Sequence, residues 1–260
     1  MTILDQLAEH ARARTAQAEQ RIPPDEMRAR AMACPRGDFA LERALKKPEL
    51  AVICECKKAS PSKGLIAPEF PYLQIAQEYA AAGADAISVL TEPKWFLGRD
   101  EYLAEIAAAV PVPCLRKDFT VDEYMIYQAR LLGASAVLLI CAILSEAELR
   151  HMIAVCNELG LSALVEAHDA PEVQMALRSG ARIIGVNNRN LKDFSVDTEN
   201  SARLRAMIPP EVLFVSESGV RSAADVQKLR ALGADAVLIG ETLMLAPNKK
   251  AKLAELRGEA

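Results

Sequence analysis

The sequence predicts an α/β fold, a closed (β/α)8 TIM barrel preceded by an N-terminal helical extension. Short apolar runs rich in small and β-branched residues alternate with helical stripes, which is typical of a parallel sheet covered by helices. This alternation yields eight strands from Ala51 onwards. A helix-ending Gly-Ala junction recurs about every 50 residues, at Gly83, Gly133, Gly180 and Gly233, each time before an even-numbered strand.

The predicted extension covers residues 1–48. Apolar residues at helical spacing, interrupted at Pro23 and Pro24, predict a helix, a turn and a second helix. Such a segment either caps an apolar end of the barrel or covers a ligand. The lack of a reactive motif favours a cap with some substrate contact. We expect residues 1–260 to form one barrel domain with this extension.

The remaining elements follow in the order expected of eight units. We expect strands from residue 51 and at 86–90, 113–117, 136–140, 162–166, 183–186, 212–216 and 236–239. We expect helices from 72 to before Gly83, at 100–109, 122–132, 146–159, 171–179, 198–207 and 222–232, and from 241. A doubly wound open sheet is the alternative. Its early G-x-G-x-x-G turn is missing, and eight evenly spaced units exceed its usual size.

Composition limits the possible partners. A net charge of -4 and 5% aromatic residues argue against nucleic-acid binding. No apolar run reaches the roughly 18 residues that span a bilayer, and no signal-peptide core is present, so we expect a cytoplasmic protein without a membrane partner. The six scattered cysteines predict buried free thiols and no metal site. His10, His151 and His168 are isolated in sequence and expected at the surface.

Charged side chains gather where the predicted strands end, which is where such barrels carry their chemistry. Alternation along each strand points Glu55, Lys57, Lys117, Glu166 and Glu217 into the barrel mouth. A single residue of this kind is more often a solvated rim residue or half of a structural ion pair. Several together predict an acid and a base that shift each other's pKa.

Two glycine-containing turns predict a phosphate site. Ser218-Gly219 and Gly240-Glu241 follow the last two strands and open helices, where bare backbone N–H groups can bind an anion. Simple tight turns are the alternative. The basic Ser/Pro/Gly-rich loop after the first strand, up to Gly64, has a composition suited to closing over an anionic ligand.

These strand-end motifs also resemble those of a known family. The motifs are Glu55–Gly64, Leu90–Glu92 with Phe96, Arg116–Phe119, Leu164–Glu166, Gly185–Leu191, Ser216–Gly219 and Ile239–Met244. In this order, from about residue 48 to 245, they resemble indole-3-glycerol-phosphate synthase, and the N-terminal extension is similar too. The resemblance implies a carboxy-lyase of tryptophan biosynthesis. Such an enzyme closes the indole ring of 1-(2-carboxyphenylamino)-1-deoxyribulose 5-phosphate, with loss of carbon dioxide and water.

The resemblance also implies residue roles. Lys117 would be the general acid and Glu166 the general base. Lys57, oriented by Glu55 and Asn187, would hold the substrate carboxylate and serve as a second acid. The other implied substrate-binding residues are Glu217, Ser218 and Arg189 for the hydroxyls and polar network, Gly219, Gly240 and Glu241 for phosphate, Ser60 from the loop, and Pro61, Phe96, Phe119 and Leu191 as walls for the aromatic ring.

The implied partner is a small anionic sugar-phosphate substrate, with no cofactor and no metal, in a monomer or alternatively a homodimer. Glu241 stands where some relatives carry serine, so its carboxylate must turn away from the phosphate or weaken binding. One rival is a related phosphate-binding barrel such as phosphoribosylanthranilate isomerase, which usually uses a cysteine and an aspartate instead. The other is a catalytically silent barrel subunit, in which the strand-end charges would be lost.

Overall fold

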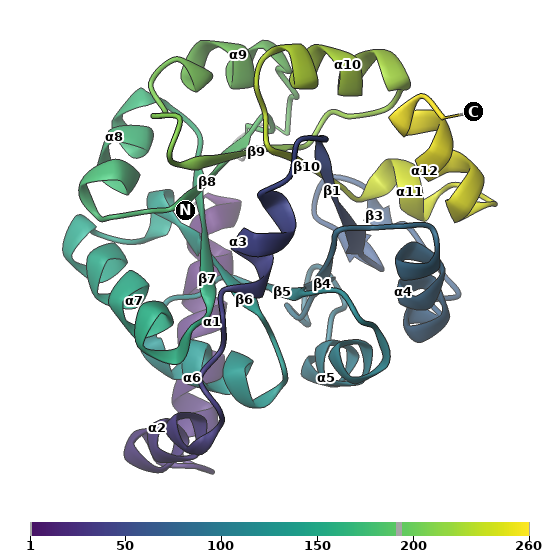
Figure 1. The fold of residues 1–260 in the computed structure, drawn as a ribbon. Helices are drawn as coiled ribbons and strands as arrows, with labels where there is room; N and C mark the ends of the chain where they lie inside the picture. Colours follow the sequence, from purple (N-terminus) through teal and green to yellow (C-terminus); the bar gives the residue numbers. More distant parts are fainter. Residues whose placement is uncertain (1, 191–193, 260) are drawn as a thin grey trace.

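The computed structural model describes residues 2–190 and 194–259 and confirms the predicted α/β barrel (Figure 1). Its parallel strands are β1 (Ala51–Cys56), β4 (Ala86–Leu90), β5 (Cys114–Lys117), β6 (Ala136–Ile140), β7 (Ser162–Ala167), β8 (Ile183–Asn187), β9 (Leu213–Glu217) and β10 (Ala236–Ile239). They close in the order β1-β10-β9-β8-β7-β6-β5-β4. The pairing of β10 with β1 closes the barrel.

The helices form an outer layer around the strands (Figure 1). They are α4 (Tyr72–Ala81), α5 (Asp100–Ala109), α6 (Glu123–Leu131), α7 (Glu146–Leu159), α8 (Ala170–Arg178), α9 (Glu199–Arg205), α10 (Ala223–Ala231), α11 (Glu241–Met244) and α12 (Lys249–Arg257), with a 3-10 turn η1 (Cys141–Ile143) after β6. The single expected last helix is therefore two helices. Within the described residues, no helix is both long and apolar enough to cross a bilayer.

The repeated Gly-Ala junction has one structural cause. Gly83, Gly133, Gly180 and Gly233 all have φ between 79° and 87°, the left-handed conformation that ends a helix at little cost for glycine. In two of the four repeats the next residue but one is an aspartate whose carboxylate accepts a backbone N–H of a neighbouring strand. Asp85 binds Val52 at 2.8 Å and Asp235 binds Phe214 at 2.7 Å. Each such junction thus ends a helix and ties the next strand to its neighbour.

Alternating residues on the strands fill the barrel interior. Ile53, Leu115, Leu164 and Val215 are all buried in one apolar cluster inside the barrel. The residues two positions further along these strands are Glu55, Lys117, Glu166 and Glu217, so the charged layer lies on top of an apolar one. The second and larger apolar cluster lies between the strands and the helices. Five cysteines are buried there, which raises the pKa of each thiol, whereas Cys34 is half-buried.

The N-terminal segment covers both ends of the barrel. It forms α1 (Ile3–Glu19), α2 (Pro24–Ala33) and a third helix that was not predicted, α3 (Ala40–Leu45). In α3, Leu41 and Leu45 are fully buried in the cluster that fills the barrel, and the helix contacts β7 at its amino end. Because α1 contributes Leu7 to the lining of the opposite, carboxyl-terminal cavity, the segment is both a cap and a cover.

Candidate active site

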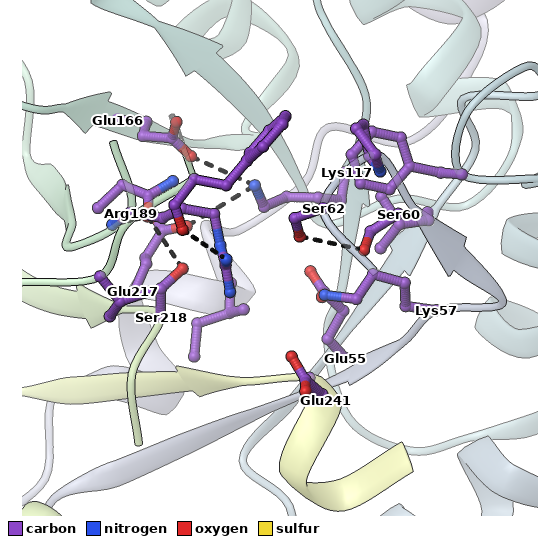
Figure 2. A pocket seen from close by; sticks show the side chains of 18 of the residues that line it. Glu55, Lys57, Ser60, Ser62, Lys117, Glu166, Arg189, Glu217, Ser218 and Glu241 are labelled. Carbon is purple, nitrogen blue, oxygen red and sulfur yellow. Dashed lines mark hydrogen bonds and ion pairs between the residues drawn. The ribbon is translucent and has the colours of Figure 1, made fainter. Parts of the chain in front are cut away.

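A cavity of about 290 Å³ opens at the carboxyl ends of the strands (Figure 2). Apart from one residue, its lining includes every residue that the sequence assigned to the site: Glu55, Lys57, Ser60, Pro61, Phe96, Lys117, Phe119, Glu166, Asn187, Arg189, Glu217, Ser218, Gly219, Gly240 and Glu241. The exception is Leu191, which lies outside the described residues. Sequence reasoning gave no specific role to Ile3, Leu4 and Leu7 of α1, which also line the cavity.

Lys117 lies at the centre of the charged layer. Its Nζ donates to Glu166 Oε2 at 3.3 Å and lies 3.7 Å from Glu217 Oε2, as the dashed lines in Figure 2 mark. Burial disfavours the ammonium form, but the carboxylates of Glu166, Glu217 and Glu55 outweigh this effect and raise the pKa of Lys117. Lys117 is therefore protonated at neutral pH.

The two carboxylates beside Lys117 have opposite pKa shifts. Burial alone would raise the pKa of Glu166, but the charges of Lys117 and His168 and a hydrogen bond with Asn187 lower it. For Glu217, burial and the carboxylates of Glu166 and Glu55 prevail over Lys117 and raise the pKa to about 8. At neutral pH the site thus holds an ionised Glu166, which can accept a proton, beside a protonated Glu217.

Gly185 makes room for Glu217. A Cβ at position 185 would lie 2.1 Å from Glu217 Oε1, which no real contact allows. Among the described residues, this Oε1 atom is buried and has no hydrogen-bond partner. A buried polar atom without a partner is costly, so this atom is available for a hydrogen bond with a bound molecule.

Lys57 and Glu55 form a second charged pair at the end of β1. Lys57 Nζ donates to Glu55 Oε1 at 2.6 Å, and both side chains are largely buried. A Cβ at Gly240 would lie 2.4 Å from Glu55 Oε1, so a larger residue there would displace this carboxylate. The strand-end pair read from the sequence therefore faces the same cavity as Lys117.

Asn187 does not contact Lys57 as the resemblance implied. Asn187 Oδ1 accepts from the Ser218 hydroxyl at 2.9 Å and from the backbone N–H of Arg189 at 3.0 Å. The reason is that each group has another partner, because Lys57 Nζ donates to Glu55 while Asn187 Oδ1 accepts from Ser218 and Arg189. Asn187 instead positions Ser218 and favours the ionised form of Glu166.

The turns after β9 and β10 have backbone conformations suited to anion binding. Ser218 and Gly219 both have positive φ, 67° and 93°, so consecutive N–H groups form a concave turn. A Cβ at position 219 would lie 2.7 Å from Thr198 Cγ2, so no larger residue fits there. Gly240 precedes α11, and the Glu241 carboxylate lies 3.1 Å from Lys63 Nζ. The Glu241 side chain is thus paired with the loop after β1.

That loop contains two short strands that were not predicted from the sequence. It forms a small antiparallel hairpin of β2 (Ala59–Ser60) and β3 (Gly64–Leu65), in which Ser60 and Ser62 hydroxyls lie 3.4 Å apart. Ser60 is buried whereas Gly64 and Leu65 are exposed. The hairpin therefore places one buried hydroxyl at the cavity and its basic tip beside Glu241.

Comparison with known proteins decides the family. A family model described as indole-3-glycerol phosphate synthase matches residues 4–256. The chain belongs to the indole-3-glycerol phosphate synthase family. A protein of this name from Lacticaseibacillus casei is 51% identical over 261 residues, covering 99% of this chain and 100% of that protein. Another, from Ruminiclostridium cellulolyticum, is 58% identical over 225 residues, covering 86% of each.

Solved structures agree with the barrel fold at low sequence identity. 3-Hexulose-6-phosphate synthase from Salmonella typhimurium superposes with a TM-score of 0.63 at 14% identity, covering 81% of this chain and 98% of that one. Thiamine phosphate pyrophosphorylase from Pyrococcus furiosus gives 0.60 at 17% identity, covering 83% and 96%. These likenesses concern the fold alone. Membership of the indole-3-glycerol phosphate synthase family confirms the resemblance inferred from the strand-end motifs.

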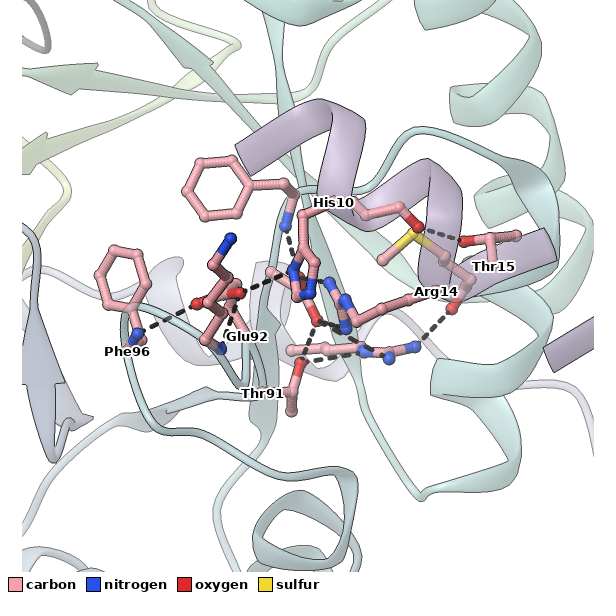
Figure 3. A network of polar contacts seen from close by, with 12 residues as sticks. His10, Arg14, Thr15, Thr91, Glu92 and Phe96 are labelled. Carbon is pink, nitrogen blue, oxygen red and sulfur yellow. Dashed lines mark hydrogen bonds and ion pairs between the residues drawn. The ribbon is translucent and has the colours of Figure 1, made fainter. Parts of the chain in front are cut away.

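In this member of the indole-3-glycerol phosphate synthase family, helix α1 is attached to the site by a histidine hydrogen bond and an ion pair (Figure 3). His10 Nδ1 lies 3.1 Å from Glu92 Oε1, and Arg14 Nη2 lies 2.7 Å from Asp118 Oδ1. Glu92 is fully buried and accepts the backbone N–H groups of Lys94, Trp95 and Phe96. His10 is therefore not isolated, as the sequence suggested, but helps to fix the loop that carries Phe96.

Replacing Arg14 by methionine is expected to destabilise the fold. Asp118 has a fully buried side chain, and losing a hydrogen-bonded cation should lower the free energy of unfolding by about 2 kcal/mol. Burial alone would raise the pKa of Asp118, but Arg14 and Arg116 lower it. The lost stabilisation is thus fully present above the unfolded pKa of about 3.9 and decreases progressively as pH falls from there through the lower pKa of Asp118 in the folded protein.

Urea unfolding at neutral pH and at about pH 3 measures this difference. The exposed neighbour Arg12, replaced by methionine, is the control and should leave stability unchanged. An equal loss at both pH values would contradict the role of the Asp118 charge.

The environment of His168 also differs from the prediction. It was expected at the surface, yet it is 18% exposed, with Nε2 3.3 Å from Glu166 Oε1 and Nδ1 3.1 Å from Glu172 Oε2. It follows β7 at the same alternation as Leu164 and Glu166, so extending the inward pattern by one more step would have found it. His151, by contrast, is exposed as predicted, beside Glu123.

Proposed function

We propose that the chain is a working indole-3-glycerol-phosphate synthase, which converts 1-(2-carboxyphenylamino)-1-deoxyribulose 5-phosphate to indole-3-glycerol phosphate in tryptophan biosynthesis. The observation that carries this proposal is the position of Lys117 between an ionised Glu166 and a protonated Glu217 in the same cavity as the two glycine turns. Incubating purified protein with the substrate and recording indole fluorescence tests it. A catalytically silent barrel gives no signal.

Lys117 serves as the acid of ring closure. The aromatic carbon that carries the carboxylate attacks the ketone carbon, the C=O electrons move to oxygen, and Lys117 gives this oxygen a proton. Breaking the bond to carbon dioxide then returns an electron pair to the ring and restores its aromaticity. The raised pKa of Lys117 supports the role, because the proton is present when the substrate arrives.

Dehydration uses a second acid and the base. The new hydroxyl leaves as water with a proton from Lys57, while Glu166 takes a proton from the ring carbon next to nitrogen and the double bond forms. Glu166 then returns its proton to Lys117, whose Nζ is 3.3 Å away. Lys57 regains its proton from solvent. This one solvent proton balances the carboxylate that leaves as neutral carbon dioxide.

Binding is divided between charged and apolar walls. Lys57, held by Glu55, lies where it can bind the substrate carboxylate. Phe96 and Phe119, with ring centroids 6.0 Å apart, and Pro61 provide an apolar wall for the aromatic ring and exclude water from the acid and base. The backbone N–H groups at Gly219, Gly240 and Glu241 bind phosphate, and Glu217, Ser218 and Arg189 bind the hydroxyls and the polar network.

The loop after β1 closes over the phosphate, and Lys63 assists this closure. Replacing Lys63 by alanine is expected to raise KM about fivefold or less and to change kcat little, because its pair with Glu241 joins two partly exposed groups. Steady-state kinetics measure both constants, with Lys250→Ala on the exposed face of α12 as the control. A loss confined to kcat would refute a role in substrate capture.

Three further features stay predictions. They are the single-domain organisation of residues 1–260 with residues 1–48 as its extension, the cytoplasmic location, and the monomer, with a homodimer as the alternative. Light scattering from the purified full chain measures the mass of the particle and decides between monomer and dimer.

A further inference from the structure

His168 occupies a position that the mechanism has not yet used. It lies directly after β7, with one imidazole nitrogen facing the proposed base Glu166 and the other facing Glu172 on α8. Glu172 also accepts the backbone N–H of His168 at 2.7 Å, and Asn200 on α9 donates to the His168 carbonyl oxygen at 3.0 Å. The imidazole is thus held between two carboxylates from two sides.

The surroundings of this pair separate it from the substrate. Glu166 lines the substrate cavity, whereas His168 and Glu172 line a neighbouring cavity of about 490 Å³. The charged groups that face Glu166 are Lys117 from β5, Glu217 from β9 and His168 itself. The other charged groups around the second cavity are Asp169, Arg189, Asp197 and Arg203, of which Arg203 is paired with Asp197 at 2.7 Å.

During the reaction, Glu166 needs a second cation besides Lys117. When Lys117 gives its proton to the ketone oxygen it becomes neutral, and Glu166 loses the cation bound to its Oε2. Glu166 is 2% exposed, and a buried carboxylate without a cation takes up a proton. A protonated Glu166 cannot then remove the ring proton in dehydration.

We propose that His168 is the permanent counter-cation of Glu166, which keeps the base ionised after Lys117 has become neutral and so makes it available for dehydration. His168 is a positioning residue, because it acts through Glu166 and does not face the substrate cavity. This inference rests on the proposed roles of Lys117 and Glu166.

The charge of His168 is consistent with this role. Burial disfavours the imidazolium, but Glu166 and Glu172 outweigh it and raise the pKa of His168 to about 10. His168 therefore carries its charge throughout the neutral range. Because its Nε2 lies 3.3 Å from Oε1, it also leaves Oε2 of Glu166 to Lys117.

The test separates ring closure from dehydration. With enzyme in excess over substrate, carbon dioxide release reports ring closure and indole fluorescence reports dehydration in a single turnover. In His168→Gln, which removes the charge but keeps a long polar side chain, we expect carbon dioxide release within about threefold of the wild type. Indole formation should slow about 10- to 100-fold, because a buried Glu166 without either cation is mostly protonated, and the ionised fraction falls tenfold for each unit by which its pKa exceeds the pH.

A second variant tests the charge itself. Glu172→Gln should lower the pKa of His168, because it removes one of the two carboxylates that raise it. We expect this variant to delay indole formation at pH 9 and to behave like the wild type at pH 6.5. His151→Gln is the matched control and should show no delay at either pH, because this histidine is 62% exposed and pairs with Glu123.

Three results would overturn the inference. The first two concern His168→Gln: both signals fall by the same factor, as a purely structural effect would produce, or both stay at the wild-type rate. The third is the absence of a delay at pH 9 in Glu172→Gln, which would show that the charge of His168 does not keep Glu166 ionised. Failure of the proposed function is recognised separately, because the wild type would then release no carbon dioxide, or Glu166→Gln would form indole at the normal rate.

Discussion

Replacing Lys117 by methionine is expected to lower kcat by about 100- to 10,000-fold, the range that a positioned acid contributes. Methionine keeps most of the side-chain volume and removes the proton that the ketone oxygen receives. The variant also leaves Glu55, Glu166 and Glu217 with one cation fewer in the buried layer, so stabilisation of the developing charge is lost as well. Steady-state indole fluorescence at neutral pH measures the loss.

A control variant and a binding measurement test whether Lys117 acts in the chemical step. Lys250→Met changes an exposed lysine on α12 and should leave kcat unchanged. Binding of the substrate to Lys117→Met, measured by calorimetry, should persist, because Lys57 and the glycine turns still bind its two anionic groups. Near-normal turnover in Lys117→Met would mean that another group protonates the ketone.

Replacing Glu166 by glutamine is expected to slow indole formation about 100- to 10,000-fold, because the amide keeps the shape but cannot accept the ring proton. Ring closure should be affected much less, since Lys117 keeps Glu217 as a partner at 3.7 Å. In a single turnover, carbon dioxide should therefore appear well before indole. Rapid quenching followed by chromatography should detect the ring-closed, still hydrated intermediate.

The matched control for Glu166 is Glu158→Gln, which changes an exposed glutamate on α7 whose carboxylate lies 3.9 Å from Arg28. It should match the wild type in both signals. If carbon dioxide and indole were delayed together in Glu166→Gln, the base would act in ring closure, and the order of steps given above would be wrong.

Strand alternation made the charged layer predictable. Glu55, Lys117, Glu166 and Glu217 each follow an apolar inward residue by two positions, and a parallel strand keeps this direction over its whole length. The end of the barrel on which they lie also follows from the strands, because all eight run the same way. The period of two along each strand was therefore enough to predict these four residues of the site from the sequence.

The elements that were missed are short or depend on contacts between distant segments. Helix α3 has six residues, too few for a clear apolar period, and it starts after Phe39 in a left-handed conformation with no side-chain cap. The hairpin strands β2 and β3 have two residues each. The partners of His10 and Asn187 depend on how α1 and the strands are arranged in space, which no local pattern encodes.

The two contacts of the N-terminal segment have a consequence for how the chain matures. Helix α1 binds Glu92 and Asp118, and α3 binds Ser162 and Arg182, all of which leave the ribosome later. Strand β1 pairs with β4, which is made soon after it, but also with β10, which is made near the end of synthesis. The N-terminal segment therefore gains its native partners in steps as the chain lengthens, and the barrel around the catalytic centre closes only after β10 has been made.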